Sequence, residues 1–318
     1  MPQKILLILV CLAMAWSAGC RKNVVPDNSQ SGSISVNGLK RTFLVHLPPS
    51  YDKSKSLPLV IALHGGGGTG ARMISLTLGG LNTLADKDGF IVACPDGIEK
   101  HWNDGRPQAI SRAHKDGVDD VGFISALIDH LDREFGIDRK RVYVTGISNG
   151  AKMSFRLACE IPDKIAAIAA VGGSMVDPVS VYTKPSRPIS VMVIHGTDDP
   201  LVLWNGGPIR FPFSKRDFGR SIPVPDAVKF WVTQNQCKAE PVSTEEADLD
   251  PNDGTRVHKE IYSGGADNTE VVFYKIQGGG HTWPNGYQYL SEKLVGKTCH
   301  DIDANALIWE FFKKHKRE

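Results

Sequence analysis

The sequence predicts an α/β fold built on a mostly parallel, twisted sheet with helices on both faces. Two observations support this prediction. Short apolar runs, typical of strands buried on both faces, recur along the chain, and helical patterns lie between them. The runs cover 57–63, 90–93, 141–145, 165–171, 189–194 and 271–276.

The remaining elements follow in chain order. Residues 33–48, SISVNGLKRTFLVHLP, predict a hairpin that turns at Asn37-Gly38. The clearest helix covers 121–135, where apolar residues recur on one face. Further helices are predicted at 151–159 and 302–312, and the Pro- and Gly-rich segment 196–225 is predicted to run over the sheet.

Composition narrows the class of protein. The 318 residues carry a net charge of +2, which favours neither a nucleic-acid partner nor an acidic one. We find no internal repeat and no strong domain break, so residues 33–318 are expected to form a single domain. The oligomeric state stays open.

The N-terminal residues predict export. Lys4 precedes the apolar run ILLILVCLAMAW, and small residues follow up to Cys20, which indicates a signal peptide over 1–19. Cleavage before Cys20 resembles bacterial lipoprotein processing, in which that cysteine is lipidated, although Ser17 stands where leucine is usual. The alternative is cleavage nearby without lipid, which gives a periplasmic or secreted protein. Residues 20–32 are expected to be a flexible tether.

A serine between two glycines marks the change from the strand at 141–145 to the following helix, in Gly146-Ile147-Ser148-Asn149-Gly150. A sharp strand-to-helix turn lifts the hydroxyl above the sheet edge and directs the Asn149 amide to the same point. Glycine on either side removes Cβ atoms that would clash. Ser148 is therefore the predicted nucleophile, and an ordinary glycine-flanked turn is the alternative.

An acid and a base follow Ser148 in the expected chain order, Ser then Asp then His. Asp199 comes after the strand at 189–194, and its H-G-x-x-D-x-x-V spacing is typical of α/β hydrolases. Asp198 is the competing candidate, and the aspartate that is not used would cap a turn. His281 follows the strand at 271–276 on three glycines and is the predicted general base.

The loop after the strand at 57–63 reads LHGGGGTG and is predicted to supply an oxyanion donor together with Asn149. Gly66 is the favoured donor and Gly67 the alternative, while His64 is expected to tie the loop down. The run lacks the lysine and the spacing of a phosphate-binding P-loop.

Four cysteines remain once the signal peptide and Cys20 are set aside. An even number in an exported protein predicts disulfides, with three possible pairings. We favour Cys237 with Cys299, because both lie in the C-terminal part, whereas Cys94 and Cys159 can be buried thiols. No CxxC spacing indicates a zinc site.

With these motifs, the chain resembles the secreted esterase family of polyhydroxybutyrate depolymerases and feruloyl esterases. The resemblance covers about residues 33–314 and implies an α/β-hydrolase fold, a triad of Ser148, His281 and Asp199, no cofactor and no metal. It rests on LHGGGG at 63–68, PDG at 95–97, WNDGR at 102–106, DDVGF at 119–123, RVYVTGISNG at 141–150, RLACEIPDKIAAIAAVGG at 156–173, HGTDDPLV at 195–202 and GGGHTWPNG at 278–286.

Two departures from the family pattern carry expectations. The family often has a cysteine where this chain has Gly264-Gly265, so its absence indicates a relocated disulfide between Cys237 and Cys299. No separate polymer-binding module follows the catalytic domain, which argues against efficient attack on crystalline polyester.

Substrate contacts are expected from aromatic residues near the motifs. Trp102, Trp204 and Trp283 lie on loops at the catalytic edge and are predicted to form an apolar pocket for an acyl or aryl group. Packing of these loops onto the core is the alternative. Arg106 is expected either to bind a substrate carboxylate or to form a surface salt bridge.

The predicted function is a serine carboxylesterase that forms an acyl-enzyme from hydroxybutyrate-type or feruloyl and other hydroxycinnamoyl esters, whether polymeric or polysaccharide-linked. An acyltransferase on the same fold, a peptidase and a catalytically dead surface binding lipoprotein are the alternatives. Contact with a membrane is expected only through the lipid on Cys20.

Overall fold

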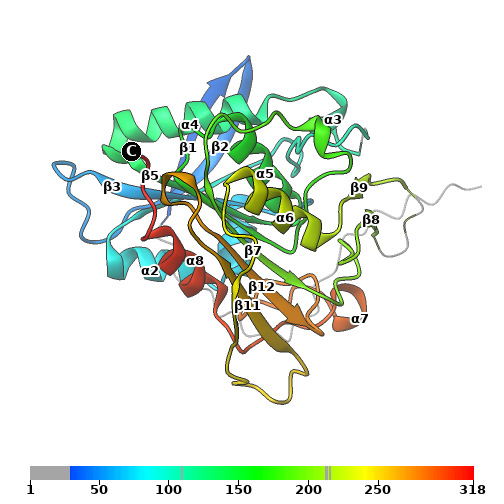
Figure 1. Cartoon of the computed structure of the whole chain (residues 1–318). Helices are drawn as coiled ribbons and strands as arrows, with labels where there is room; N and C mark the ends of the chain where they lie inside the picture. Colours follow the sequence, from blue (N-terminus) through cyan, green and yellow to red (C-terminus); the bar gives the residue numbers. More distant parts are fainter. Residues whose placement is uncertain (1–28, 109, 212–213, 215) are drawn as a thin grey trace, which may run out of the picture.

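The computed structural model describes residues 29–108, 110–211, 214 and 216–318. Within them, the main sheet has the strand order β1-β2-β4-β3-β5-β6-β7-β12-β11-β10 (Figure 1). The pairs from β4 to β12 are parallel, and the pairs at both edges are antiparallel. The strands are β1 (Gln30–Val36), β2 (Leu39–His46), β3 (Leu57–Leu63), β4 (Ile91–Pro95), β5 (Ile137–Ile147), β6 (Ala167–Val171), β7 (Ser190–Gly196), β10 (Val242–Glu245), β11 (Arg256–Tyr262) and β12 (Val271–Gln277), with β8 (Gly207–Pro208) and β9 (Arg220–Ser221) in a separate small sheet.

Helices cover both faces of the main sheet (Figure 1). On one face α4, α5 and α6 pack against a core that includes Leu59 and Ile61 of β3, and on the other face α1, α2 and α8 pack against Val60 and Ala62. Because both faces are buried, the inner strands are apolar throughout, and the predicted α/β-hydrolase fold is confirmed. The helices are α1 (Gly70–Leu76), α2 (Gly80–Asp88), α3 (Arg112–Lys115), α4 (Asp120–Phe135), α5 (Asn149–Glu160), α6 (Val224–Gln234), α7 (Glu292–Val295) and α8 (Ala304–Phe312).

The N-terminal hairpin turns as predicted, with positive φ at Asn37 and Gly38. Its first strand begins at Gln30, so the last three residues of the expected tether belong to the sheet. The signal peptide and Cys20 lie outside the described residues. In the part of the chain that the structure covers, no helix has the length and apolar character needed to cross a membrane.

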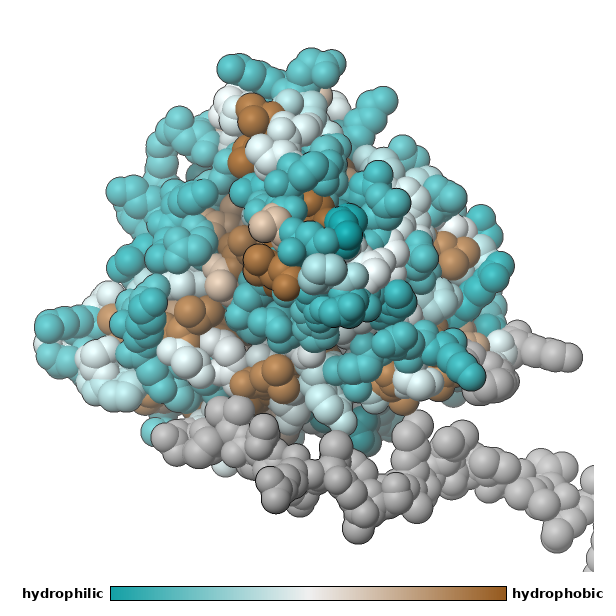
Figure 2. Space-filling view, turned by 90° about the horizontal axis from the view of Figure 1, so that it is seen from below, coloured by the Kyte–Doolittle hydropathy of each residue, from teal (hydrophilic) through white to brown (hydrophobic). Residues whose placement is uncertain are grey.

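The C-terminal edge of the sheet holds two strands that the sequence did not predict. β10 is exposed along its whole length, and β11 has three consecutive polar residues, His258, Lys259 and Glu260, between Val257 and Ile261. Edge strands of this kind lack the continuous apolar run by which the inner strands were recognised. Figure 2 shows one face of the molecule, on which hydrophobic residues form small patches among hydrophilic ones.

The predicted disulfide between Cys237 and Cys299 is wrong, since neither is disulfide-bonded. Cys237 packs with the core on the α6 face, whereas Cys299 belongs to the core on the opposite face, so the sheet separates them. A Cβ atom placed on Gly265 would lie 2.8 Å from the sulfur of Cys237. Cys237 thus faces the segment where the family often has a cysteine and this chain has glycine.

Candidate active site

Ser148 occupies the turn between β5 and α5 with a φ of 58° and a ψ of −115°. A residue with a side chain rarely adopts this conformation, so the surrounding structure must hold it there. Its amide donates to the carbonyl of Val171 at the end of β6, 3.0 Å away. The turn therefore lies at the carboxyl edge of the parallel strands, and Ser148 is partly exposed there.

The two glycines around Ser148 let β3 pass close to this turn. A Cβ atom on Gly150 would lie 2.3 Å from the carbonyl oxygen of Leu63 and 2.7 Å from that of His64. One on Gly146 would lie 2.7 Å from the Leu63 oxygen. Because both obstacles are backbone atoms, only glycine fits at either position.

Substitution of Gly150 by alanine should therefore lower the free energy of unfolding by about 1–3 kcal/mol, through overpacking against β3. Urea denaturation measures the loss, and ester hydrolysis should fall with it as the turn is displaced. Ser75→Ala, at an exposed serine of α1, is the control and should keep the wild-type stability. Wild-type stability in Gly150→Ala would contradict the close approach of β3.

His281 and Asp199 form a buried pair, with 2.6 Å between His281 Nδ1 and Asp199 Oδ2. The other oxygen of Asp199 accepts hydrogen bonds from the amides of Leu201 and Val202, each 2.8 Å long. A carboxylate can only accept, so Nδ1 of His281 donates and its Nε2 is left to take a proton. Burial acts to raise the pKa of Asp199, but the neighbouring His281 outweighs burial and the pKa lies below its usual value.

The neighbouring aspartate is placed differently. Asp198 is exposed and accepts a hydrogen bond from Thr197 Oγ1 at 2.8 Å. Of the two competing aspartates, the structure brings Asp199 to His281 and leaves Asp198 at the surface.

Ser148 and His281 both lie beside the segment that follows β6. A Cβ atom on Gly172 would lie 3.4 Å from His281 Nδ1, and one on Gly173 would lie 3.1 Å from the Ser148 carbonyl oxygen. The turn and the imidazole, which come from distant parts of the sequence, therefore flank the same two glycines at one edge of the sheet.

The glycine-rich loop after β3 lies on the other side of Ser148. A Cβ atom on Gly65 would lie 3.4 Å from Ser148 Cβ, and one on Gly66 would lie 3.8 Å from Asn149 Cβ. The amide of Gly67 already donates to the Lys100 carbonyl at 2.8 Å. The Gly66 amide is thus better placed than that of Gly67 to act beside the Asn149 amide.

Comparison with known proteins places the chain in a family. A family model for phospholipases and carboxylesterases matches residues 50–207. The chain is also 30% identical over 287 residues to "Putative esterase NocK" of Nocardia uniformis subsp. tsuyamanensis, an alignment that covers 89% of this chain and 82% of the relative. The chain belongs to the α/β-hydrolase esterase family. It is a carboxylic ester hydrolase.

Further proteins named as esterases align over most of the chain. Feruloyl esterase D of Neurospora crassa is 27% identical over 312 residues, covering 95% of this chain and 91% of the relative. The solved acetyl xylan esterase from Aspergillus awamori has a TM-score of 0.55 at 16% identity, over 80% of this chain and 94% of its own. A ferulic acid esterase from Anaeromyces mucronatus gives 0.52 at 16% identity, over 83% and 88%. These two structures share the fold of this esterase.

His64 ties the glycine-rich loop of the esterase to the neighbouring turn. Its Nδ1 donates to the Gly65 carbonyl at 2.8 Å, and its Nε2 accepts from the Gly97 amide at 3.0 Å. Burial lowers the pKa of His64 to about 4. The ring is therefore neutral near pH 7, and protonation would break the hydrogen bond from Gly97.

Acidification should lower the free energy of unfolding of the esterase through this histidine. The folded pKa of His64 lies below its ordinary value of 6.5, so its contribution is complete above pH 6.5 and is lost as the pH falls toward 4. The loss amounts to about 3 kcal/mol of unfolding free energy. Urea titrations at pH 7, 5.5 and 4.5 measure it, and His64→Asn should show a smaller fall over that range. An equal fall in both proteins would contradict the assignment.

Asp104 is a fully buried carboxylate that the sequence analysis did not single out. Arg106 binds it with two nitrogens, at 2.9 Å from Nε to Oδ1 and 2.7 Å from Nη2 to Oδ2. His114 Nε2 and Asn149 Nδ2 lie 2.9 and 2.7 Å from its oxygens. Burial acts to raise the pKa of Asp104, but Arg106 and His114 hold it far below its usual range. Arg106 is thus a buried partner of Asp104, and neither predicted role for it is correct.

Lys152, one helical turn after Ser148, is also buried. Its Nζ donates to the Ser174 carbonyl at 2.7 Å and to Ser221 Oγ at 2.6 Å, and burial lowers its pKa to about 7. These bonds attach α5 to the segments around residues 174 and 221. The available signals for both missed residues were local: a charged pair in WNDGR and a lysine among apolar residues of a helix.

The predicted tryptophan pocket is wrong for two of its three members. Trp102 and Trp283 have no exposed surface; their ring N–H groups donate to the His64 carbonyl at 2.9 Å and to Asn305 Oδ1 at 3.2 Å. They fasten loops to the core, as the alternative reading proposed. Trp204 is half-buried, and its contact with substrate remains a prediction.

One group of potential metal ligands occurs among the described residues. Atoms of Asp253, Cys299 and Asp301 lie within 4.8 Å of one another. The two carboxylates already accept hydrogen bonds from four backbone amides, which gives them a role in fastening loops.

Proposed function

We propose that this esterase cleaves carboxylic esters through an acyl-enzyme on Ser148. In this proposal His281 is the general base, Asp199 orients it, and the amides of Gly66 and Asn149 bind the oxyanion. The observation that carries the proposal is the 2.6 Å contact of His281 with Asp199 at the same sheet edge as the strained turn of Ser148.

The proton and electron movements follow from that arrangement. His281 Nε2 takes the proton as Ser148 Oγ attacks the ester carbonyl carbon, and the carbonyl electrons move to the oxygen held by the two amides. When the intermediate collapses, the C–O bond to the alcohol breaks, and His281 gives the proton to the leaving oxygen. Water then repeats the sequence on the acyl-enzyme and releases the acid.

We propose feruloyl and related hydroxycinnamoyl esters, free or linked to polysaccharide, as the substrates, ahead of hydroxybutyrate oligomers. The support is that relatives named feruloyl esterase C and D align with this chain. Half-buried Trp204 stacks on Phe273, with ring centroids 5.8 Å apart, and offers an aromatic surface to an aryl group.

Hydrolysis of methyl ferulate, hydroxybutyrate oligomers and p-nitrophenyl acetate by the wild-type protein tests this proposal. We expect a higher kcat/KM on methyl ferulate than on hydroxybutyrate oligomers. Treatment with a phosphonate should give an adduct that mass spectrometry maps to Ser148. A higher value on hydroxybutyrate oligomers would overturn the substrate assignment, and an adduct elsewhere would overturn the mechanism.

We also propose export, with the lipid on Cys20 as the anchor, on the evidence of the N-terminal sequence. Cell fractionation of the wild type and of Cys20→Ser tests it: the wild type should be in the membrane fraction and the variant should not. The same distribution for both would contradict the anchor.

A further inference from the structure

The segment 102–106, WNDGR, contacts the backbone or side chains next to both proposed oxyanion donors. Trp102 packs its ring against the ring of His64, with centroids 4.9 Å apart, and its Nε1 donates to the His64 carbonyl at 2.9 Å. His64 begins the loop that carries the Gly66 amide. The tryptophan ring therefore fastens the start of that loop.

The backbone of the same tryptophan holds the side chain of Asn149. The Trp102 amide donates to Asn149 Oδ1 at 2.8 Å, and Asn149 Nδ2 donates to the Trp102 carbonyl at 3.0 Å. Asn149 directly follows Ser148, and its backbone amide is the second proposed donor. A fixed side chain limits how far that amide can move.

Asp104 supplies the charged partner of Asn149. Nδ2 donates its second hydrogen to Asp104 Oδ2 at 2.7 Å, and the carboxylate is fully buried. A hydrogen bond to an ionised acceptor is about twice as strong as one between neutral groups. Of the three bonds that fix the Asn149 side chain, the one from Asp104 is therefore expected to be the strongest.

Asp104 is itself held by two neighbours. Arg106, which binds it with two nitrogens, also donates from Nη1 to the Phe218 carbonyl at 2.6 Å. A carboxylate can only accept, so His114 of α3 donates to Asp104 from Nε2, and its Nδ1 lies 2.8 Å from Ser111 Oγ. These contacts fix the carboxylate that Asn149 needs.

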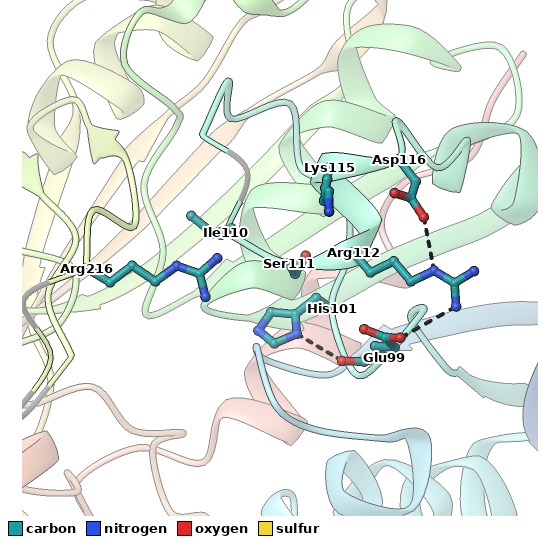
Figure 3. Close-up of a pocket in the computed structure, with 8 residues that line it drawn as sticks. All are labelled: Glu99, His101, Ile110, Ser111, Arg112, Lys115, Asp116 and Arg216. Atoms are coloured by element: carbon teal, nitrogen blue, oxygen red, sulfur yellow. Dashed lines mark hydrogen bonds and ion pairs between the residues drawn. The ribbon is translucent and has the colours of Figure 1, made fainter. Parts of the chain in front are cut away.

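A pocket of about 580 Å³ lies beside this network (Figure 3). Ser111 and His101 both line it, and ring atoms of His101 lie 3.3 Å from the position of a Cβ atom on Gly66. Asp104 has no exposed surface, so its bond to Asn149 is shielded from water in the pocket. The network thus acts as a dry support next to an open space.

We propose that Asp104 is the positioning residue of the oxyanion site, which fixes the Asn149 amide beside that of Gly66 through the Asn149 side chain. The inference rests on the proposed function, because it assumes that these two amides bind the oxyanion. Such donors act on charge that develops in the transition state, and a shift of about 0.5 Å weakens them. Loss of the contact should therefore lower kcat and leave KM nearly unchanged.

Two variants remove this contact from its two ends. In Asp104→Asn and in Asn149→Ala, kcat on p-nitrophenyl acetate should fall roughly 10- to 100-fold, less than the loss of a whole donor, while KM stays within about threefold. The Ki of a trifluoromethyl ketone, whose adduct with Ser148 carries an oxyanion, should rise by the same factor as kcat falls. Asp226→Asn, at an exposed aspartate of α6, is the control and should keep the wild-type kcat.

The double variant tests whether both residues act through one bond. Its kcat should lie within about threefold of the slower single variant, because the second change removes a contact that is already lost. Losses that multiply would overturn the positioning role, as would a rise in KM at unchanged kcat.

The remaining outcomes separate folding, positioning and the proposed function. Asp104 also neutralises Arg106, so Asp104→Asn can fail to fold, which thermal melting shows. Asn149→Ala then decides alone, since it leaves that ion pair in place, and a wild-type kcat in this variant overturns the inference but not the esterase mechanism. Wild-type turnover in Ser148→Ala would instead overturn the proposed function, and the inference with it.

Discussion

Ser148→Ala is expected to lower kcat on p-nitrophenyl acetate by about 10⁶-fold, the effect seen when the serine of a catalytic triad is removed. Without Oγ, no acyl-enzyme forms, and His281 has no hydroxyl from which to take a proton. What remains is the small acceleration from substrate binding and oxyanion contacts. Steady-state kinetics with active-site titration by a phosphonate measure the change.

The fold should survive this substitution. The amide of Ser148 donates to Val171 whatever its side chain, and alanine keeps the Cβ atom beside Gly65. Thermal melting should therefore resemble that of the wild type. Ser75→Ala, at an exposed serine of α1, is the control and should keep full activity. More than a tenth of the wild-type turnover in Ser148→Ala would rule out the acyl-enzyme.

Asp199→Asn is expected to lower kcat by about 10⁴-fold, as the same change does in a serine protease triad. The amide carries no charge to stabilise the imidazolium that forms in the transition state. Its NH₂ group can also donate to His281 Nδ1, which moves the ring proton to Nε2 and removes the general base. Measurement of kcat and kcat/KM across pH separates this effect from a loss of binding.

Asp198→Asn makes the same chemical change one residue away. Because the Asp198 side chain is exposed and accepts its hydrogen bond from Thr197 rather than from His281, activity should stay within about twofold of the wild type. The reverse ranking of the two variants would mean that the pairing of Asp199 with His281 is not the working arrangement.

Much of the fold could be predicted because the relevant physics is local. Residues buried on both faces of a sheet must be apolar throughout, and this is why β3 was predicted with its observed bounds, 57–63. The exposed strand β10 has no such requirement and was missed. β5 begins four residues before the apolar run at 141–145, and this part was missed because Asp138, Arg139 and Lys140 interrupt the apolar pattern.

The candidate site also has features that the local sequence predicts and features that it does not. A serine in a strand-to-helix turn can be recognised from the sequence, because glycine is needed at 146 and 150 where β3 passes close to the turn. The sequence alone therefore determined the turn at Ser148, the chain order of its partners and the glycine-rich loop beside it. The turn and the loop each depend on backbone geometry within a few residues.

Only the tertiary structure decided between Asp198 and Asp199, separated Cys237 from Cys299 and placed Trp102 in the core. It also revealed the Asp104 network and the pocket beside it. These outcomes depend on burial and on distances between segments far apart in the chain. A local pattern specifies the chemistry of a side chain, whereas its neighbours are set by how the loops pack across the edge of the sheet.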